Sequence, residues 1–142
     1  MKRFAWILML SIGLAARGAG AADTMVGQWK TVDEKSGAVE SVVELYDQGG
    51  KLFGKVVSLT KPTDEQGKPK ICSKCTGAEK DQSIVGLIIV KDLARGGDSW
   101  KGGTILDPDD GKIYKAELWV EDGKLKVRGY LGPFHRTQTW VK

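Results

Sequence analysis

Proline, cysteine and histidine are scarce in this chain of 142 residues, and their scarcity excludes several kinds of site. The sequence holds four prolines, two cysteines and one histidine. One chain therefore cannot build a metal site that needs four cysteine and histidine ligands. The 41% of apolar and 28% of charged residues exclude a disordered or membrane-spanning chain. The length is that of one domain.

Glycine, in contrast, is abundant. Nineteen glycines make up about 13% of the chain, nearly twice the usual share of roughly 7%. Many glycines beside aspartates are typical of short strands joined by tight turns. No segment after the N-terminal region shows the apolar period of an amphipathic helix. The sequence therefore predicts an all-β protein.

Residues 1–22 have the pattern of a secretory signal peptide. A positively charged start precedes a mainly apolar run of thirteen residues, which is too short to span a bilayer, and small residues follow at positions 19–21. We expect cleavage after Ala21 or Ala22. Residues 23–142 then form the mature protein, which we expect to be periplasmic or secreted.

Most of the net charge lies in this N-terminal segment. The whole chain carries +4 at pH 7, but the signal peptide contains three of the basic residues and no acidic one. The mature chain holds 19 basic and 18 acidic side chains, which gives a net charge of +1. This balance argues against a nucleic-acid partner.

Apolar segments alternate with turn-forming clusters through the rest of the chain. The alternation of apolar and polar side chains is clearest over residues 114–120 and 125–131, as in half-buried strands. We expect eight strands, most of them joined by short hairpin turns. They span residues 25–32, 38–46, 51–60, 84–93, 99–106, 112–120, 124–131 and 134–141.

Eight antiparallel strands in meander order leave two exposed edges unless the sheet closes on itself. Closure into an up-and-down barrel removes both edges. A two-layer sandwich is the alternative, but it needs longer crossing connections than most of these turns provide. We therefore predict a single eight-stranded antiparallel up-and-down barrel over residues 23–142.

The two ends of the chain resemble the lipocalins and the wider calycin group. Gly27 and Trp29 open the first strand, and Arg136 lies in the last one. The resemblance implies that Arg136 covers the Trp29 indole at the barrel base, in a cation–π contact worth up to about 2 kcal/mol. Glycines in strands mark bends or close backbone approaches, so we expect Gly27 to belong to the same barrel-closing group.

A closer resemblance covers nearly all of the mature chain. It is carried by Gly27-Gln28-Trp29, Asp107-Pro108, Gly111-Lys112-Ile113-Tyr114, the segment from Lys126 to Phe134 and the segment from Arg136 to Trp140. These segments resemble a bacterial exported family known as the domain of unknown function 2147. The resemblance implies an envelope or secreted protein with a lipocalin-like barrel. It implies no established activity, and no catalytic residue can be carried over from the family.

Cys72 and Cys75 lie in a long polar segment between the third and fourth expected strands. In an oxidising compartment we expect them to form a structural disulfide, whose small ring contributes only about 2 kcal/mol. A redox pair is an alternative, although the helix that would lower the pKa of the first cysteine is not visible. A zinc site is the other alternative, and it needs further ligands from a second chain.

Aromatic side chains are the best candidates for contact with a ligand or a partner. We expect Trp100, Trp119 and Tyr130 on an outer patch or at a barrel mouth, where aromatic groups suit binding better than burial does. The complete candidate set is Trp100, Tyr114, Trp119, Tyr130 and Phe134. Trp29 and Trp140 are expected to lie in the core.

The leading hypothesis is a barrel that binds one small apolar or amphipathic molecule. An envelope structural or protein-interaction module with a filled barrel is the alternative. Catalysis is least supported, because the single histidine, His135, has no identifiable acid–base partner and is expected to face solvent. The segment Asp107-Pro108-Asp109-Asp110-Gly111 is expected to be a solvated hairpin turn. Neither a metal nor a cofactor is predicted.

Overall fold

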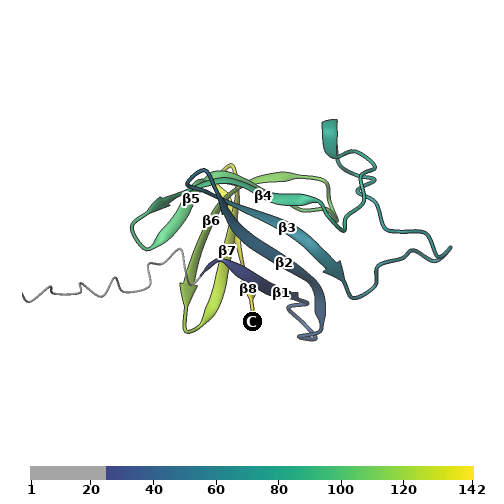
Figure 1. Ribbon diagram of the computed structural model, residues 1–142, viewed down its shortest axis with the longest axis horizontal. Coiled ribbons are helices and arrows are strands. Elements are labelled where there is room, and N and C mark those ends of the chain that lie inside the picture. Colours follow the sequence, from purple (N-terminus) through teal and green to yellow (C-terminus); the bar gives the residue numbers. More distant parts are fainter. Residues whose placement is uncertain (1–24) are drawn as a thin grey trace, which may run out of the picture.

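The computed structural model describes residues 25–142 of the protein (Figure 1), so the predicted signal peptide and its cleavage site lie outside the described residues. Eight strands follow one another in a meander, and each pairs antiparallel with the next. Their bounds are β1 Gly27–Val32, β2 Val39–Gln48, β3 Lys51–Leu59, β4 Ile88–Gly96, β5 Ser99–Leu106, β6 Ile113–Glu121, β7 Lys124–Leu131 and β8 Phe134–Trp140. A single 3-10 turn, η1 Gly77–Glu79, lies in the long connection between β3 and β4.

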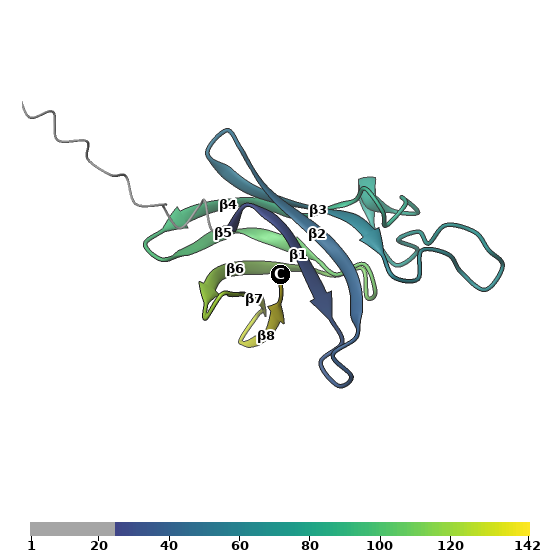
Figure 2. The same cartoon turned by 60° about the horizontal axis from the view of Figure 1, so that its bottom comes forward.

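The sheet curves into a nearly closed barrel, which is seen in Figure 2. Beyond the end of β8, Val141 meets Lys30 of β1 through two backbone hydrogen bonds of 2.6 and 3.0 Å. We call this contact the seam. The predicted eight-stranded, lipocalin-like up-and-down barrel is therefore confirmed. Among residues 25–142 there is no helix of the length and apolar character needed to cross a membrane.

The strand limits agree with the prediction to within two residues except in β4, which was expected over residues 84–93 and spans Ile88–Gly96. Gly86 adopts a positive φ of 94°, and the Leu87 backbone N–H donates to the Ile84 carbonyl, so the chain turns here. Ile84 is nevertheless buried, with 9% of its surface exposed. Ile84 therefore packs as part of the long loop. The strand begins only at Ile88.

The apolar core fills one end of the barrel, which we call the closed end. Trp29 is 1% exposed, and its indole N–H donates to the carbonyl of the fully buried Met25 at 2.8 Å. Trp140 is 2% exposed, which confirms the core positions expected for both tryptophans. No polar or charged residue is buried in the described part of the chain, so the core is held together by apolar contact.

The meander sends alternate turns to opposite ends of the barrel. The turns after β2, β4 and β6 lie at the closed end, and the connections after β1, β3, β5 and β7 lie at the other, open end. The longest connection, residues 60–87, therefore leaves the barrel at the open end, as the teal segment in Figure 1 shows. This loop is folded on itself, because Ile71 pairs with Ser83 and the Ile84 backbone N–H donates to the Lys70 carbonyl.

Candidate functional site

A cavity of about 990 Å³ enters the barrel from its open end. Its deeper wall is apolar because the inward positions of the strands carry aliphatic and aromatic side chains. Trp140, at the deepest point of β8, adjoins the packed core. The main apolar residues that line the cavity are Val56, Ile89, Leu106, Val127 and Trp140.

Polar groups occur at intermediate depth on the side formed by β8, β1 and β2. The hydroxyl groups of Thr31 and Ser41 share a hydrogen bond of 2.6 Å. The Gln138 side-chain carbonyl accepts a hydrogen bond from the Trp140 indole N–H at 3.3 Å. Closer to the entrance, Arg136 Nη2 lies 3.4 Å from Glu34 Oε2. The cavity is therefore amphipathic, with an apolar floor and a polar entrance.

Carboxylates gather at the entrance from the β1–β2 and β5–β6 turns. Backbone N–H groups of Ser36 and Lys35 donate to Asp33 and lower the pKa of its carboxyl group. Burial raises the pKa of Asp107, although its carboxylate accepts the Asp109 backbone N–H at 2.9 Å. These two turns thus hold carboxylates with opposite pKa perturbations on the same entrance.

Glu40 and Tyr114 show that the entrance acids act on one another and on their neighbours. Partial desolvation raises the pKa of Glu40, and the charges of Asp33, Asp109 and Asp107 add to this effect. The Tyr114 hydroxyl donates to Asp110 Oδ2 at 2.5 Å, and this hydrogen bond raises the pKa of Tyr114 to about 12.

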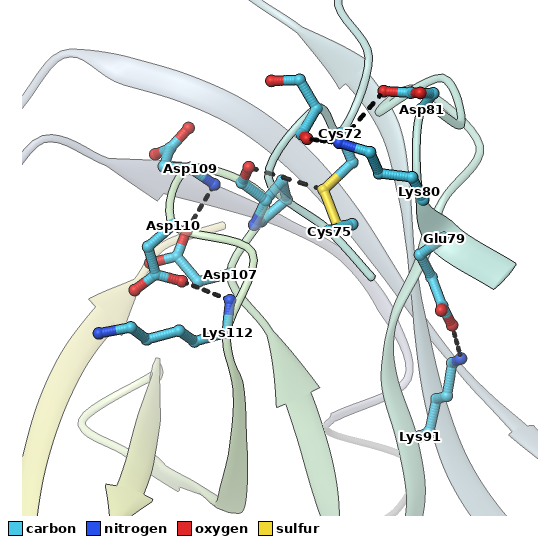
Figure 3. The surroundings of a disulfide bond; sticks show 12 residues. Cys72, Cys75, Glu79, Lys80, Asp81, Lys91, Asp107, Asp109, Asp110 and Lys112 are labelled. Atoms are coloured by element: carbon cyan, nitrogen blue, oxygen red, sulfur yellow. Dashed lines mark hydrogen bonds and ion pairs between the residues drawn. A yellow bond between two sulfur atoms is a disulfide. The ribbon is translucent and has the colours of Figure 1, made fainter. Parts of the chain in front are cut away.

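The disulfide Cys72–Cys75 supports the acidic β5–β6 turn from outside, as Figure 3 shows. The two cysteines are buried, at 0% and 2% exposure, although the loop around them is exposed. Cys72 Sγ lies 3.7 Å from the Pro108 carbonyl oxygen. At Gly111 a Cβ atom would overlap the Lys74 carbonyl oxygen, so the two backbones are in direct contact. The predicted disulfide is confirmed, and it positions part of the entrance.

The long loop is also attached to the barrel wall. Lys91 of β4 donates to Glu79 of the loop at 2.6 Å, and this hydrogen bond lowers the pKa of Glu79. Figure 3 shows both this ion pair and the disulfide contact. The loop is therefore fixed both to β4 and to the β5–β6 turn.

The five aromatic candidates separate into three groups. Tyr114 and Phe134 line the cavity, and Phe134 is 77% exposed at the entrance. Trp119 and Tyr130 lie on the outer face, where Arg128 covers Trp119 at 4.9 Å and Tyr130 donates to Glu117 at 3.0 Å. Neither belongs to the cavity wall.

Trp100 requires a correction, because it lies neither on an outer patch nor at the barrel mouth. Its side chain is 3% exposed and belongs to the core. A register shift between Lys101 and Gly103, with a positive φ of 85° at Gly102, interrupts the simple alternation of β5. Before this irregularity Trp100 pairs with the buried Leu118 of β6, so the two side chains lie on the inner face of the sheet.

The predicted contact of Arg136 with Trp29 is also wrong. Lys142 Nζ lies over the Trp29 ring, 4.5 Å from its centroid, whereas Arg136 pairs with Glu34 at the open end. The seam explains the difference, because pairing Lys30 with Val141 places the last residue of the chain beside Trp29. Gly27 does lie at the closed end, where a Cβ atom would be 3.9 Å from Lys142 Nζ.

Sequence reasoning missed the entrance carboxylates because it treated each acidic turn separately. The predicted strand order nevertheless indicated that the acidic turns lie together. In a meander, the turns after β1 and β5 occur at the same end, so Asp33 and the aspartates at positions 107, 109 and 110 must share one entrance. Within residues 25–142 no three His, Cys, Asp or Glu side chains are arranged to hold a metal ion. His135 is exposed, and its ring lies 5.8 Å from that of Tyr130.

Comparison with protein families gives a match over residues 27–142 to a family described as an uncharacterized protein conserved in bacteria, DUF2147. The chain belongs to this family. None of the curated proteins matches the chain significantly.

Among solved structures, Protein HP1028 from the human pathogen Helicobacter pylori, described as belonging to the lipocalin family, is similar with a TM-score of 0.68. The two chains are 23% identical, and the match covers 83% of this chain and 82% of that one. At this identity the likeness establishes the lipocalin-like fold of this DUF2147 chain and nothing about its ligand.

Proposed function

We propose that this DUF2147 protein is exported and binds one small apolar or amphipathic molecule inside its barrel. The cavity of about 990 Å³ is the observation that carries the proposal. Its volume is at the upper end of the range of roughly 300–1,000 Å³ that is usual for small-molecule sites. Lipocalin-like barrels are suited to this role because eight strands enclose room for one small ligand.

The cavity distinguishes binding from the alternative of a structural envelope module with a filled barrel. A filled barrel would have side chains packed through to both ends. Here the core of the closed end stops at the cavity floor, where Val127 and Trp140 border both the core and the cavity. The outer aromatics Trp119 and Tyr130 already have partners on their own surface, so they give weaker support to a protein-binding role.

A binding role without catalysis is also favoured by the positions of the reactive groups. The only histidine of the sequence, His135, lies at the cavity entrance, where its ring is 5.8 Å from that of Tyr130 and no carboxylate within residues 25–142 is hydrogen-bonded to it. Asp33, Asp107 and Asp110 accept hydrogen bonds within their own turns. These contacts fix the shape of the entrance, and they do not form the hydrogen-bonded nucleophile and base of a hydrolytic site.

Titration with the uncharged fluorescent probe N-phenyl-1-naphthylamine tests the proposal. We expect saturable binding, and we expect Val127→Phe to weaken it at least tenfold because the larger ring occupies the cavity. Ile113→Phe is the matched control, since Ile113 is 54% exposed and outside the cavity wall. Leu131→Trp, at an entrance position that is 47% exposed, narrows the opening without touching the core. Absence of saturable binding, or equal affinity in all four proteins, would contradict the proposal.

A further inference from the structure

The cavity wall has a charge opposite in sign to that of the rest of the mature chain. Six carboxylates and three cations occur among the residues that line it, a net charge of −3. Since residues 23–142 carry +1 in total, the remainder of the chain carries +4. The carboxylates are those of Asp33, Glu34, Glu40, Asp107, Asp109 and Asp110, and the cations are Lys61, Lys70 and Arg136.

The three cations do not cancel the negative charge evenly around the entrance. Arg136 is paired with Glu34, so this pair contributes no net charge. Lys61 and Lys70 belong to the long β3–β4 connection on one side. The two lysines are therefore separate from the five carboxylates that form no ion pair within residues 25–142, which lie on the β1–β2 and β5–β6 turns and on β2.

Two of these five carboxylates are available to an incoming group. Asp33 accepts backbone N–H groups from Lys35 and Ser36. Asp107 accepts the Asp109 N–H, and Asp110 accepts the Lys112 N–H and the Tyr114 hydroxyl. The carboxylates of Glu40 and Asp109 accept no hydrogen bond and form no ion pair with any residue between 25 and 142. Both side chains border the cavity.

The negative groups are also close enough to influence one another. Asp33, Asp109 and Asp107 each raise the pKa of Glu40. Like charges held together at an entrance repel, and a cation placed among them relieves that repulsion. An anion placed there would instead be repelled by these carboxylates.

We propose that the barrel selects amphiphiles with a positively charged head, such as a protonated amine or a quaternary ammonium group. The apolar part lies against the floor formed by Val127 and Trp140, and the head lies between Glu40 and Asp109 at the entrance. This inference rests on the proposed function, because the cavity is the site and the carboxylates decide only which ligand charge it accepts. From Phe134 to Trp140, β8 extends roughly 20 Å, long enough to accommodate a dodecyl chain.

Three dodecyl compounds that differ only in the head group provide the test. Dodecyltrimethylammonium, 1-dodecanol and dodecyl sulfate are each titrated below their aggregation limits, at low ionic strength, by isothermal calorimetry. We expect affinity to fall in that order, with at least a tenfold ratio between the ammonium and the sulfate compound. Raising the salt concentration is expected to reduce this ratio, because salt screens charges near solvent.

The double variant Glu40→Gln/Asp109→Asn is expected to lower the ammonium-to-sulfate ratio about tenfold, because each exposed charge pair contributes about threefold and the two contributions multiply. Asp98→Asn removes one charge at the closed end and is expected to keep the wild-type ratio. Equal or tighter binding of the sulfate compound would overturn the inference, as would a ratio that is unchanged in the double variant. If neither the dodecyl compounds nor N-phenyl-1-naphthylamine binds, the proposed function itself fails.

Discussion

Replacing Gly111 with alanine tests whether the disulfide loop holds the acidic β5–β6 turn in place. Two effects are combined at this position. The backbone has a φ of 72°, where an L-residue costs about 1–2 kcal/mol. The new Cβ atom would also overlap the Lys74 carbonyl oxygen and lie 2.9 Å from the Cys75 backbone nitrogen. Overpacking of this kind costs about 1–3 kcal/mol more.

Gly123 provides a closely matched control in the β6–β7 turn at the closed end. Its φ is also 72°, but a Cβ atom there would have nothing within 4 Å. Gly123→Ala is therefore expected to lose only the conformational part, about 1–2 kcal/mol. Gly111→Ala is expected to lose about 2–5 kcal/mol, the sum of both effects.

Urea unfolding followed by tryptophan fluorescence measures the two losses, since the free energy of unfolding falls linearly with denaturant concentration. The contact energy is the difference between the two variants. A difference below about 0.5 kcal/mol would refute the idea that the loop and the turn are held in rigid contact. Titration of each variant with dodecyltrimethylammonium gives a second measurement, and only Gly111→Ala is expected to weaken its binding.

Three further outcomes are expected. Lys142→Ala should lower the free energy of unfolding by about 0.5–1 kcal/mol, because it removes the cation over Trp29. Arg136→Ala should leave it nearly unchanged, because the pair of Arg136 with Glu34 is exposed. A larger loss for Arg136→Ala than for Lys142→Ala in urea unfolding would contradict the structural assignment. In an ultraviolet absorbance titration one tyrosine should ionise near pH 12, and Tyr114→Phe should remove that step. Because the pKa of Tyr114 is raised in the folded protein, its hydrogen bond to Asp110 stabilises the fold fully below about pH 10, and this stabilisation is lost as the pH rises towards 12. Intact mass of the protein from its host envelope should show a start at Ala22 or Asp23, with neither Cys72 nor Cys75 alkylated before reduction; a start at Met1 would overturn the export proposal.

The strands and their order could be predicted from the sequence because these features depend on local patterns. Alternating side chains in β6 and β7 and glycine-rich turns at positions 96–97 and 122–123 determine where strands begin and end. The short turns then predict a meander everywhere except across the long β3–β4 connection. The disulfide was also predictable, because two cysteines three residues apart in a chain that is expected to be exported favour a disulfide.

The partners of individual residues were harder to predict, because they depend on the register of the closed sheet. Arg136 and Lys142 are both cations near the end of the chain, and only the pairing of Lys30 with Val141 decides that Lys142 reaches Trp29. The same limit applies to the entrance. Glu40 and Asp109 lie far apart in the sequence, and they meet only because the barrel brings the β1–β2 and β5–β6 ends together.

The seam gives the barrel an order of assembly. Every strand pair in the meander joins neighbours in the chain, whereas Lys30 and Val141 are about 110 positions apart. Local hairpins form early, and closing such a large loop comes late because its entropy must be lost before the contact is made. Within residues 25–142 two backbone hydrogen bonds join β1 to the chain after β8, so the seam is also the place where amide protons should exchange first. A barrel opened there exposes the edges of β1 and β8, and a second opened copy could pair with them to form a strand-exchanged dimer.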